Sequence, residues 1–130
     1  MSLALKVWNS IVTTLATAVV IAKDAVALSN AFEAWKKKWA VTQVVVSIAM
    51  AGTIDGDATV EIFGSADGTN FDTVAVDNMG GTMAPTAGAT VQKSFLVYDL
   101  YAFKVAVTNG TSTAGNMTVT ITARPYRWES

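Results

Sequence analysis

The chain has 130 residues, of which 52% are hydrophobic and 15% charged, and its formal net charge is −1. This length suits one domain with a sizeable core, and the near-neutral charge counts against long disorder and against a dedicated nucleic-acid binder. Cysteine and histidine are both absent, which excludes disulfides, zinc–thiolate sites and Ser–His or Cys–His catalytic pairs.

Charge is distributed unevenly along the chain. Residues 1–40 carry five lysines against two acids, residues 41–92 carry six acids and no base, and residues 93–130 carry four bases against two acids. This pattern suits head-to-tail contact between identical copies, because opposite charges then face each other. The plainer interpretation is that acidic turn residues happen to fall in the middle of the chain, and both interpretations stay open.

Residues 7–22 carry no charge between Lys6 and Lys23. The stretch is shorter than the roughly 18 apolar residues of a membrane span, and several threonines dilute it, so we expect no membrane partner. Ala16-Thr17-Ala18 imitates a signal-peptide cleavage site, but the sequence retains Met1. We therefore expect an unprocessed protein that is made inside a cell.

Residues 1–40 are predicted as a separate N-terminal segment whose secondary structure is ambiguous. Apolar residues from Ala4 to Val26 recur at helical spacing opposite polar ones, which is typical of an amphipathic helix. The abundance of Val, Ile and Thr favours strands or an extended arm, and we prefer that interpretation. Asn30 followed by Glu33 also predicts a capping box that opens a short helix ending at Trp39.

From Val41 onward, apolar residues alternate with polar ones, which predicts strands with one buried face. The predicted strands cover residues 43–50, 58–62, 101–107 and 117–123. In the first of them, Val44, Val46 and Ile48 share the face that we expect to be buried. In the last, a row of threonines forms the exposed face, which suits their branched, hydroxylated side chains.

Turn-forming residues separate these strands, among them Asp55-Gly56-Asp57, Asp67-Gly68-Thr69-Asn70 and Asn109-Gly110. Residues 78–90 are rich in Gly, Ala and Thr and are predicted as a long loop. The sequence therefore predicts an all-β fold. It is an antiparallel β-sandwich or jelly-roll-like domain over residues 41–130, with a C-terminal tail and preceded by an N-terminal arm or short helix over residues 1–40.

The most conspicuous local cluster is Trp35-Lys36-Lys37-Lys38-Trp39. Such a cluster suits phosphate binding or stacking on bases or sugars. The alternative is that the tryptophans anchor the segment to the core or to a neighbour while the lysines stay solvated. We favour this alternative, because three lysines in a chain of net charge −1 make a weak nucleic-acid surface, and we expect no nucleic-acid partner.

Sites for metal or catalytic chemistry have little support. Asp67, Asn70 and Asp72 offer oxygen ligands for calcium, but their spacing is not that of an EF-hand loop, and Asp–Gly pairs are ordinary turn formers. The acids lie mostly in predicted turns, and no histidine is present to activate a serine. We expect no enzyme activity, no catalytic residue and no cofactor.

The tryptophans and Tyr126 lie in the N-terminal segment and the C-terminal tail, outside the predicted strands of residues 41–123. They are Trp8, Trp35, Trp39, Tyr126 and Trp128, and Arg127 lies among the last of them. Aromatic residues and arginine are preferred anchors at protein interfaces, which predicts termini that grip neighbouring subunits. Exposed tryptophans would equally suit a sugar-stacking platform.

Three parts of the sequence resemble structural proteins of tailed-bacteriophage virions. The residues are ATVEIFGSADGTNFDT (58–73), VAVTNG (105–110) and MTVTIT (117–122). They are similar to a unit of strand, Gly-Ser-x-Asp-Gly-Thr-Asn-aromatic turn and strand, followed by a late Asn–Gly turn and a threonine-rich final strand. The resemblance covers residues 40–123, is architectural, and extends to hairpins of bacterial surface and carbohydrate-binding domains.

The resemblance implies a capsid decoration (cement) protein or a related head or tail component that acts in many copies. The expected partners are further copies of this chain and other virion subunits such as the major capsid protein, and the expected location is the virion, after synthesis in the host cytoplasm. A carbohydrate-binding module with a glycan partner is the first alternative. A pilin-like filament subunit is the second, and it requires a helix over residues 3–28.

Overall fold

The computed structural model describes residues 5–22, 24–34, 38–50, 56–77, 79–86, 88–110 and 116–129. Over these residues the chain is all-β, as predicted, and no helix long and apolar enough to cross a membrane occurs among them. The strands are β1 (Leu5–Trp8), β2 (Thr13–Ile21), β3 (Val26–Leu28), β4 (Val41–Met50), β5 (Ala58–Ser65), β6 (Gly81–Met83), β7 (Ala89–Tyr98), β8 (Ala102–Asn109) and β9 (Met117–Glu129).

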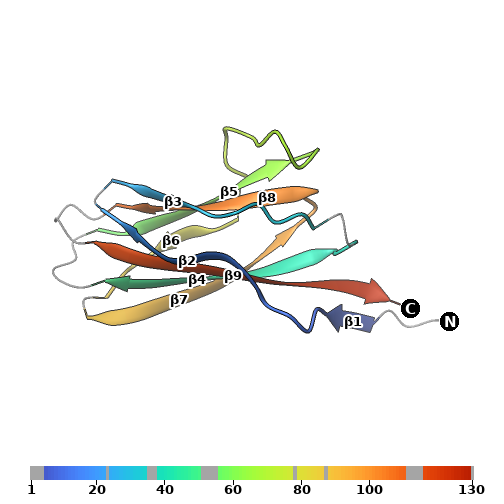
Figure 1. Ribbon diagram of the computed structural model, residues 1–130, viewed down its shortest axis with the longest axis horizontal. Helices are drawn as coiled ribbons and strands as arrows, with labels where there is room; N and C mark the ends of the chain where they lie inside the picture. Colours follow the sequence, from blue (N-terminus) through green and yellow to red (C-terminus); the bar gives the residue numbers. More distant parts are fainter. Residues whose placement is uncertain are drawn as a thin grey trace.

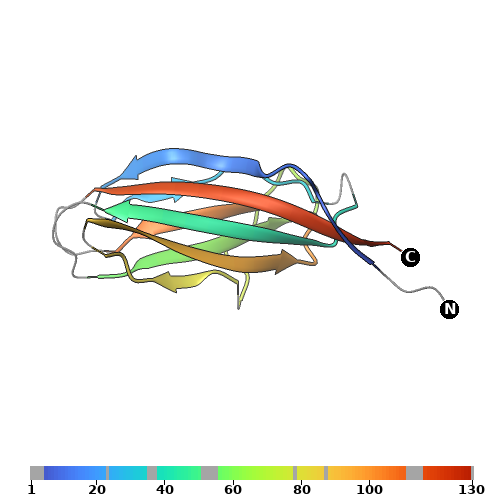
Figure 2. The ribbon, with the colours of Figure 1, turned by 90° about the horizontal axis from the view of Figure 1, so that it is seen from below.

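The strands form two antiparallel sheets that pack face to face (Figure 1). The first sheet has the order β9–β4–β7, with β1 and β2 both paired to the other side of β9. The second sheet has the order β3–β8–β5–β6. Seen from below, the first sheet lies in front of the second, and both chain termini lie at the same end of the long axis (Figure 2).

The core lies between the sheets and consists of the alternating residues that the sequence pattern predicted. Val44, Val46 and Ile48 of β4 are fully buried. In β9, Val119 and Ile121 are their register partners on the same inner face, opposite Ile48 and Val46. The second sheet contributes a matching inner row from β5 and β8, namely Val60, Ile62, Phe103, Val105 and Val107.

Residues 5–28, predicted as an arm or an amphipathic helix, form strands that belong to the sandwich. β2 pairs with β9 in the first sheet, and β3 pairs with β8 in the second. Leu15, Ile21 and Ala27 are buried in the same core as β4 and β9. The helix alternative is therefore wrong for these residues, and β2 and β3 belong to the sandwich rather than to an arm.

The short helix predicted from Asn30 to Trp39 is absent from the residues that are described in this stretch. Phe32 instead forms an isolated β-bridge with Phe103, through hydrogen bonds of 2.8 and 3.0 Å in both directions. The two rings lie 5.4 Å apart, and both side chains are buried. Burial of Phe32 and backbone pairing with β8 together favour an extended chain over a helical turn.

The predicted loop over residues 78–90 contains a strand and the start of another. β6 pairs with β5 through Val60↔Gly81 and Ala58↔Met83, and β7 begins at Ala89. Gly80, just before β6, has φ +87°, and a side chain there would collide with the carbonyl oxygen of Val60. The glycine-rich composition thus permits a close strand approach rather than an open loop.

Candidate functional site

The two ends of the chain form a two-stranded ribbon that projects beyond the sandwich (Figures 1 and 2). We call β1 together with residues 124–129 of β9 the terminal ribbon. Its register runs from Leu5↔Glu129 to Trp8↔Tyr126. Pairing between β4 and β9 ends at Val41↔Tyr126, so residues 127–129 pair with β1 alone within the described structure.

An aromatic cluster covers one face of the terminal ribbon. Trp8 and Tyr126 are register partners with ring centroids 4.7 Å apart, and Tyr126 and Trp128 lie 5.8 Å apart in an edge-on arrangement. The ammonium group of Lys6 lies 4.6 Å from the Tyr126 ring centroid, 5.5 Å from that of Trp128 and 5.7 Å from that of Trp8. Cation–π attraction therefore ties β1 to the end of β9.

The sequence pattern of these ends explains why the cluster forms. Lys6 and Trp8 are two residues apart on one strand, as are Tyr126 and Trp128 on the other, so antiparallel pairing brings all four side chains to one face. The three aromatic residues are among the interface anchors predicted from the sequence, whereas Lys6 is not. The Lys-x-Trp and Tyr-x-Trp spacing was the available signal, and it becomes informative once the register is known.

The cluster stays largely open to solvent. The Tyr126 ring is buried, whereas Trp8 is 41% exposed and Trp128 is 54% exposed; on the opposite face of the ribbon, Leu5 is 63% exposed. A two-stranded ribbon is marginally stable by itself, and large exposed aromatic groups are typical of surfaces that a partner covers. The terminal ribbon is therefore the strongest candidate for an interaction site.

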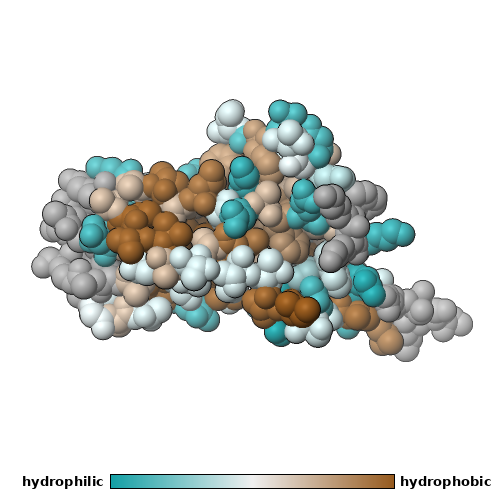
Figure 3. All heavy atoms as spheres, viewed as in Figure 1, coloured by the Kyte–Doolittle hydropathy of each residue, from teal (hydrophilic) through white to brown (hydrophobic). Residues whose placement is uncertain are grey.

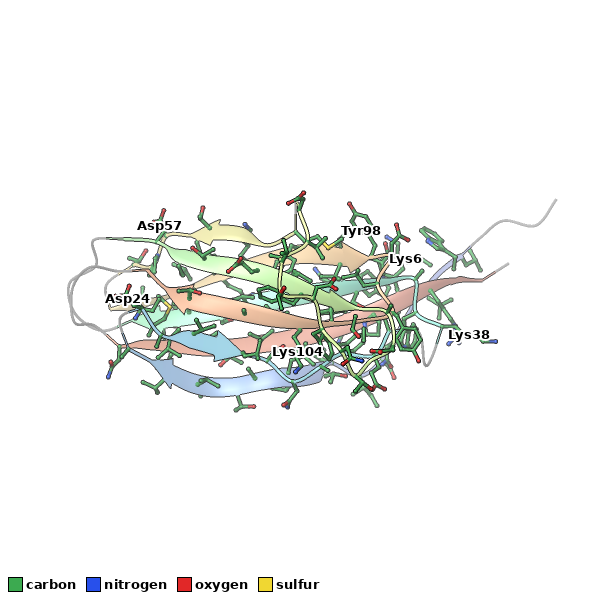
Figure 4. The ribbon with its side chains drawn as sticks, turned by 90° about the horizontal axis from the view of Figure 1, so that it is seen from above. Lys6, Asp24, Lys38, Asp57, Tyr98 and Lys104 are labelled. Carbon is green, nitrogen blue, oxygen red and sulfur yellow. The ribbon has the colours of Figure 1, made fainter. Side chains whose placement is uncertain are left out.

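The other predicted anchors are arranged differently. Trp39 packs partly against the core, and the guanidinium group of Arg127 lies 5.1 Å from its ring centroid. Lys38 is exposed at the same end of the molecule (Figure 4). The remaining members of that cluster, Trp35, Lys36 and Lys37, lie outside the described residues. Trp39 thus serves as a core contact, and the structure does not join it to the aromatic cluster of the ribbon.

A second apolar surface, which the sequence did not reveal, lies where β2 and β3 run along one side of the sandwich (Figure 3). We call Val19, Val20, Val26 and Leu28 the edge patch; Val20, Val26 and Leu28 are each more than half exposed. β2 is an edge strand interrupted by register shifts, and β3 is a three-residue edge strand. Short or bulged edge strands resist uncontrolled pairing, whereas the exposed side chains remain free to pack.

The predicted calcium ligands lie in the turn after β5, where Asp67 organises the backbone. Its carboxylate accepts hydrogen bonds of 2.8 Å from the N–H groups of Thr69 and Asn70 and from the Asn70 side chain, and one of 3.1 Å from the Ser65 hydroxyl. These bonds, above all those from Asn70, hold the pKa of Asp67 far below its ordinary value of 3.8. The carboxylate is used as a turn-former, and calcium binding by Asp67, Asn70 and Asp72 stays a prediction.

Replacement of Asp67 by asparagine is expected to weaken the dependence of stability on acid pH. A carboxyl group whose pKa is depressed by folding stabilises the protein above its unfolded-state pKa, and this contribution is lost as the pH falls below about 4. As the pH is lowered from about 5 to about 2.5, the melting temperature of wild type should therefore fall more steeply than that of Asp67→Asn. Asp77→Asn, at another exposed aspartate, is the control; equal slopes for all three proteins would contradict the role of Asp67.

Two shallow, open hollows flank the turn between β7 and β8. One, of about 370 Å³, is lined by Trp39, Ala40 and the turn residues Asp99, Leu100 and Tyr101. The other, of about 380 Å³, shares those turn residues and extends to Ser65, Ala66 and Asp72. Among the described residues, no three acidic side chains gather as a metal site would require. Because both hollows are shallow and open, the terminal ribbon is a stronger candidate for a binding site than either of them.

No protein-family model matches the chain, and the search of curated proteins gave no match. The described surface is characterised by the terminal ribbon, the edge patch and the hollows beside Tyr101. The first two are apolar, exposed and built on strands. Such surfaces are suited to binding another protein over an area rather than to enclosing a small molecule.

Proposed function

We propose that this chain is a non-enzymatic structural subunit of a tailed-bacteriophage particle, which packs on or between capsid or tail subunits and stabilises the particle. The observation that carries the proposal is the terminal ribbon. It projects from a well-packed sandwich and presents Trp8 and Trp128 largely uncovered, with Lys6 across their rings. Tryptophan and tyrosine are the side chains that contribute most to protein interfaces.

The rest of the fold supports the same role. The sandwich supplies a body with one shared apolar core, and part of the apolar surface left outside that core lies on the ribbon and the edge patch. The turn organised by Asp67 belongs to one of the three parts of the chain that resemble virion proteins, and its hydrogen bonds are structural. A subunit that is buried by its neighbours carries such apolar surface outside its own core.

The two alternatives have less support. A sugar-stacking platform favours parallel exposed rings, but Trp8 is tilted by 57° to Tyr126, and Trp128 is perpendicular to it, with the Lys6 ammonium above all three. The pilin-like alternative requires a helix over residues 3–28. That stretch holds the strands β1, β2 and β3.

Removal of both exposed tryptophans is expected to prevent incorporation of the chain into particles. The experiment supplies either wild type or Trp8→Ala/Trp128→Ala to a phage from which the gene for this chain has been deleted. The variant should be incorporated at least tenfold less than wild type, because interface tryptophans contribute roughly 2 kcal/mol or more each to binding. Quantitative mass spectrometry of purified particles measures the number of copies. The melting temperature should change little, because both side chains lie outside the core.

Val74→Ala is the control, because Val74 is an exposed apolar residue (78%) in the connection after β5, outside the ribbon. It should be incorporated as wild type. Absence of the wild-type chain from particles, or full incorporation of the double variant, would refute the proposal. Robust glycan-array binding that the double variant loses would favour the carbohydrate-binding alternative instead.

A further inference from the structure

The ends of the long axis differ in the charge that they carry (Figure 4). Lys6 and Lys38 lie at the end of the terminal ribbon, and Asp24 and Asp57 lie at the opposite end. Among the described residues, the terminal ribbon holds three bases against one acid (Lys6, Arg124 and Arg127 against Glu129), whereas the opposite end holds Asp24 and Asp57. The end of one copy is therefore electrostatically complementary to the opposite end of another.

Asp24 lies directly beside the edge patch. The turn that contains it joins β2 to β3. It therefore lies between Val20, near the end of β2, and Val26, at the start of β3, whose side chains are both exposed. The fully buried Asn109 fixes this turn: its carbonyl accepts the Asp24 N–H at 2.8 Å, and its side-chain nitrogen donates to the Ile21 carbonyl at 3.2 Å. An apolar surface with a carboxylate at its rim is thus held in place by a buried polar contact.

The terminal ribbon has the complementary arrangement. Trp8 and Trp128 are exposed apolar groups on one face of the ribbon, and Lys6 is the exposed base between them. Because the ribbon projects past the sandwich, it is able to reach a neighbour that lies along the long axis (Figure 2). The two surfaces lie on different parts of the molecule, so one copy is able to use both at once.

We propose that copies of this chain associate head to tail, with the terminal ribbon of one copy on the edge patch of the next and Lys6 of the first facing Asp24 of the second. The inference rests on the proposed function and names the partner surface: a second copy of this chain. A symmetric contact is disfavoured, because ribbon against ribbon brings Lys6 near its own counterpart and patch against patch does the same for Asp24. Head-to-tail contacts of this kind give open chains or closed rings.

Sedimentation velocity with two complementary variants tests this directly. Trp8→Ala/Trp128→Ala disables the ribbon and keeps the patch, whereas Val20→Lys/Val26→Lys disables the patch and keeps the ribbon. Wild type should form species longer than two chains as concentration rises, and each variant alone should stay monomeric. An equimolar mixture of the two should form dimers only, since one functional ribbon and one functional patch remain. Val74→Lys, at a more exposed valine outside both surfaces, should assemble as wild type.

Wild type that stays monomeric at every concentration, a mixture that stays monomeric, or either variant that assembles as wild type would overturn the inference.

If a double variant fails to fold, the single variants Lys6→Gln and Asp24→Asn are measured instead. Each should weaken association about threefold, and the combined variant should weaken it no further, because the pair is already broken; additive losses would refute the pairing. Monomeric wild type that is nevertheless found in particles would refute this inference and leave the proposed function standing.

Discussion

A chain that begins at residue 41 is expected to remain unfolded, although residues 41–130 contain all the strands that alternate clearly in sequence. Leu15, Ile21 and Phe32 are buried in the shared core and would be lost. At about 1.5–3 kcal/mol for each buried side chain, the loss amounts to roughly 5–9 kcal/mol, which is comparable to the whole stability of a typical domain. Removal of β2 and β3 also leaves the backbone edges of β9 and β8 unpaired.

The matched control is a chain that begins at residue 13. It lacks β1 but keeps β2, β3 and the bridge between Phe32 and Phe103. Near-ultraviolet circular dichroism and urea unfolding should show a cooperative transition for this chain and none for the chain that begins at residue 41. A cooperatively folded fragment of residues 41–130 would contradict the finding that the first 40 residues complete the core.

Replacement of Phe103 by alanine is expected to lower the free energy of unfolding by about 3–5 kcal/mol. The Phe103 side chain is 1% exposed, packs against Phe32 and belongs to the second sheet where it faces β4 and β9. Its deletion leaves a cavity between the sheets and removes the ring that holds the Phe32 segment. Chemical denaturation of wild type and variant measures the difference.

Phe71→Ala is the control of the same chemistry. Phe71 is half-buried in the connection after β5, where the Lys104 ammonium lies 4.5 Å from its ring centroid. Its loss should cost about 1 kcal/mol, because only a surface cation–π contact and partial burial are removed. An equal loss in the free energy of unfolding for Phe71→Ala and Phe103→Ala would mean that packing between the two sheets is not the main source of stability.

The strands that could be predicted from the sequence are those with one face in the core and the other face towards solvent. In β4, Val44, Val46 and Ile48 face the other sheet, while Gln43 and Ser47 face outward, so burial and period-two polarity agree. The threonine row of β9 follows the same rule, with its inner residues fully buried. For these central strands, the pattern was sufficient to predict strand, face and class of fold.

Edge strands were predicted less well than central strands, because their pattern depends on their neighbours. β6 has three residues, and its strand conformation comes from pairing with β5 rather than from its own composition. In β7 the inner row includes Lys93, which is half-buried and donates a 2.8 Å hydrogen bond to the Gly80 carbonyl. In β2, two register shifts and a φ of +44° at Ala18 break the period of two, so the sequence resembled a helix as much as a strand.

The candidate site was predictable in part. Trp8, Tyr126 and Trp128 were chosen because aromatic groups near chain ends are typical anchors, but their contact depends on a strand register that joins residues more than 110 positions apart. The edge patch was missed because Val19, Val20 and Val26 belong to apolar stretches that suit a core. Their exposure follows from the position of β2 and β3 at the sheet edges, which only the topology shows.

Electron cryomicroscopy of the phage particles that carry this chain tests its proposed role most directly. We expect density for the sandwich at many equivalent positions on the capsid or tail. The terminal ribbon should be covered by a neighbouring subunit, and the side chains of Trp8 and Trp128 should lie at that contact. Particles that lack this density, or a sandwich whose ribbon faces only solvent, would contradict the account of the chain as a structural subunit that grips its neighbours through its ends.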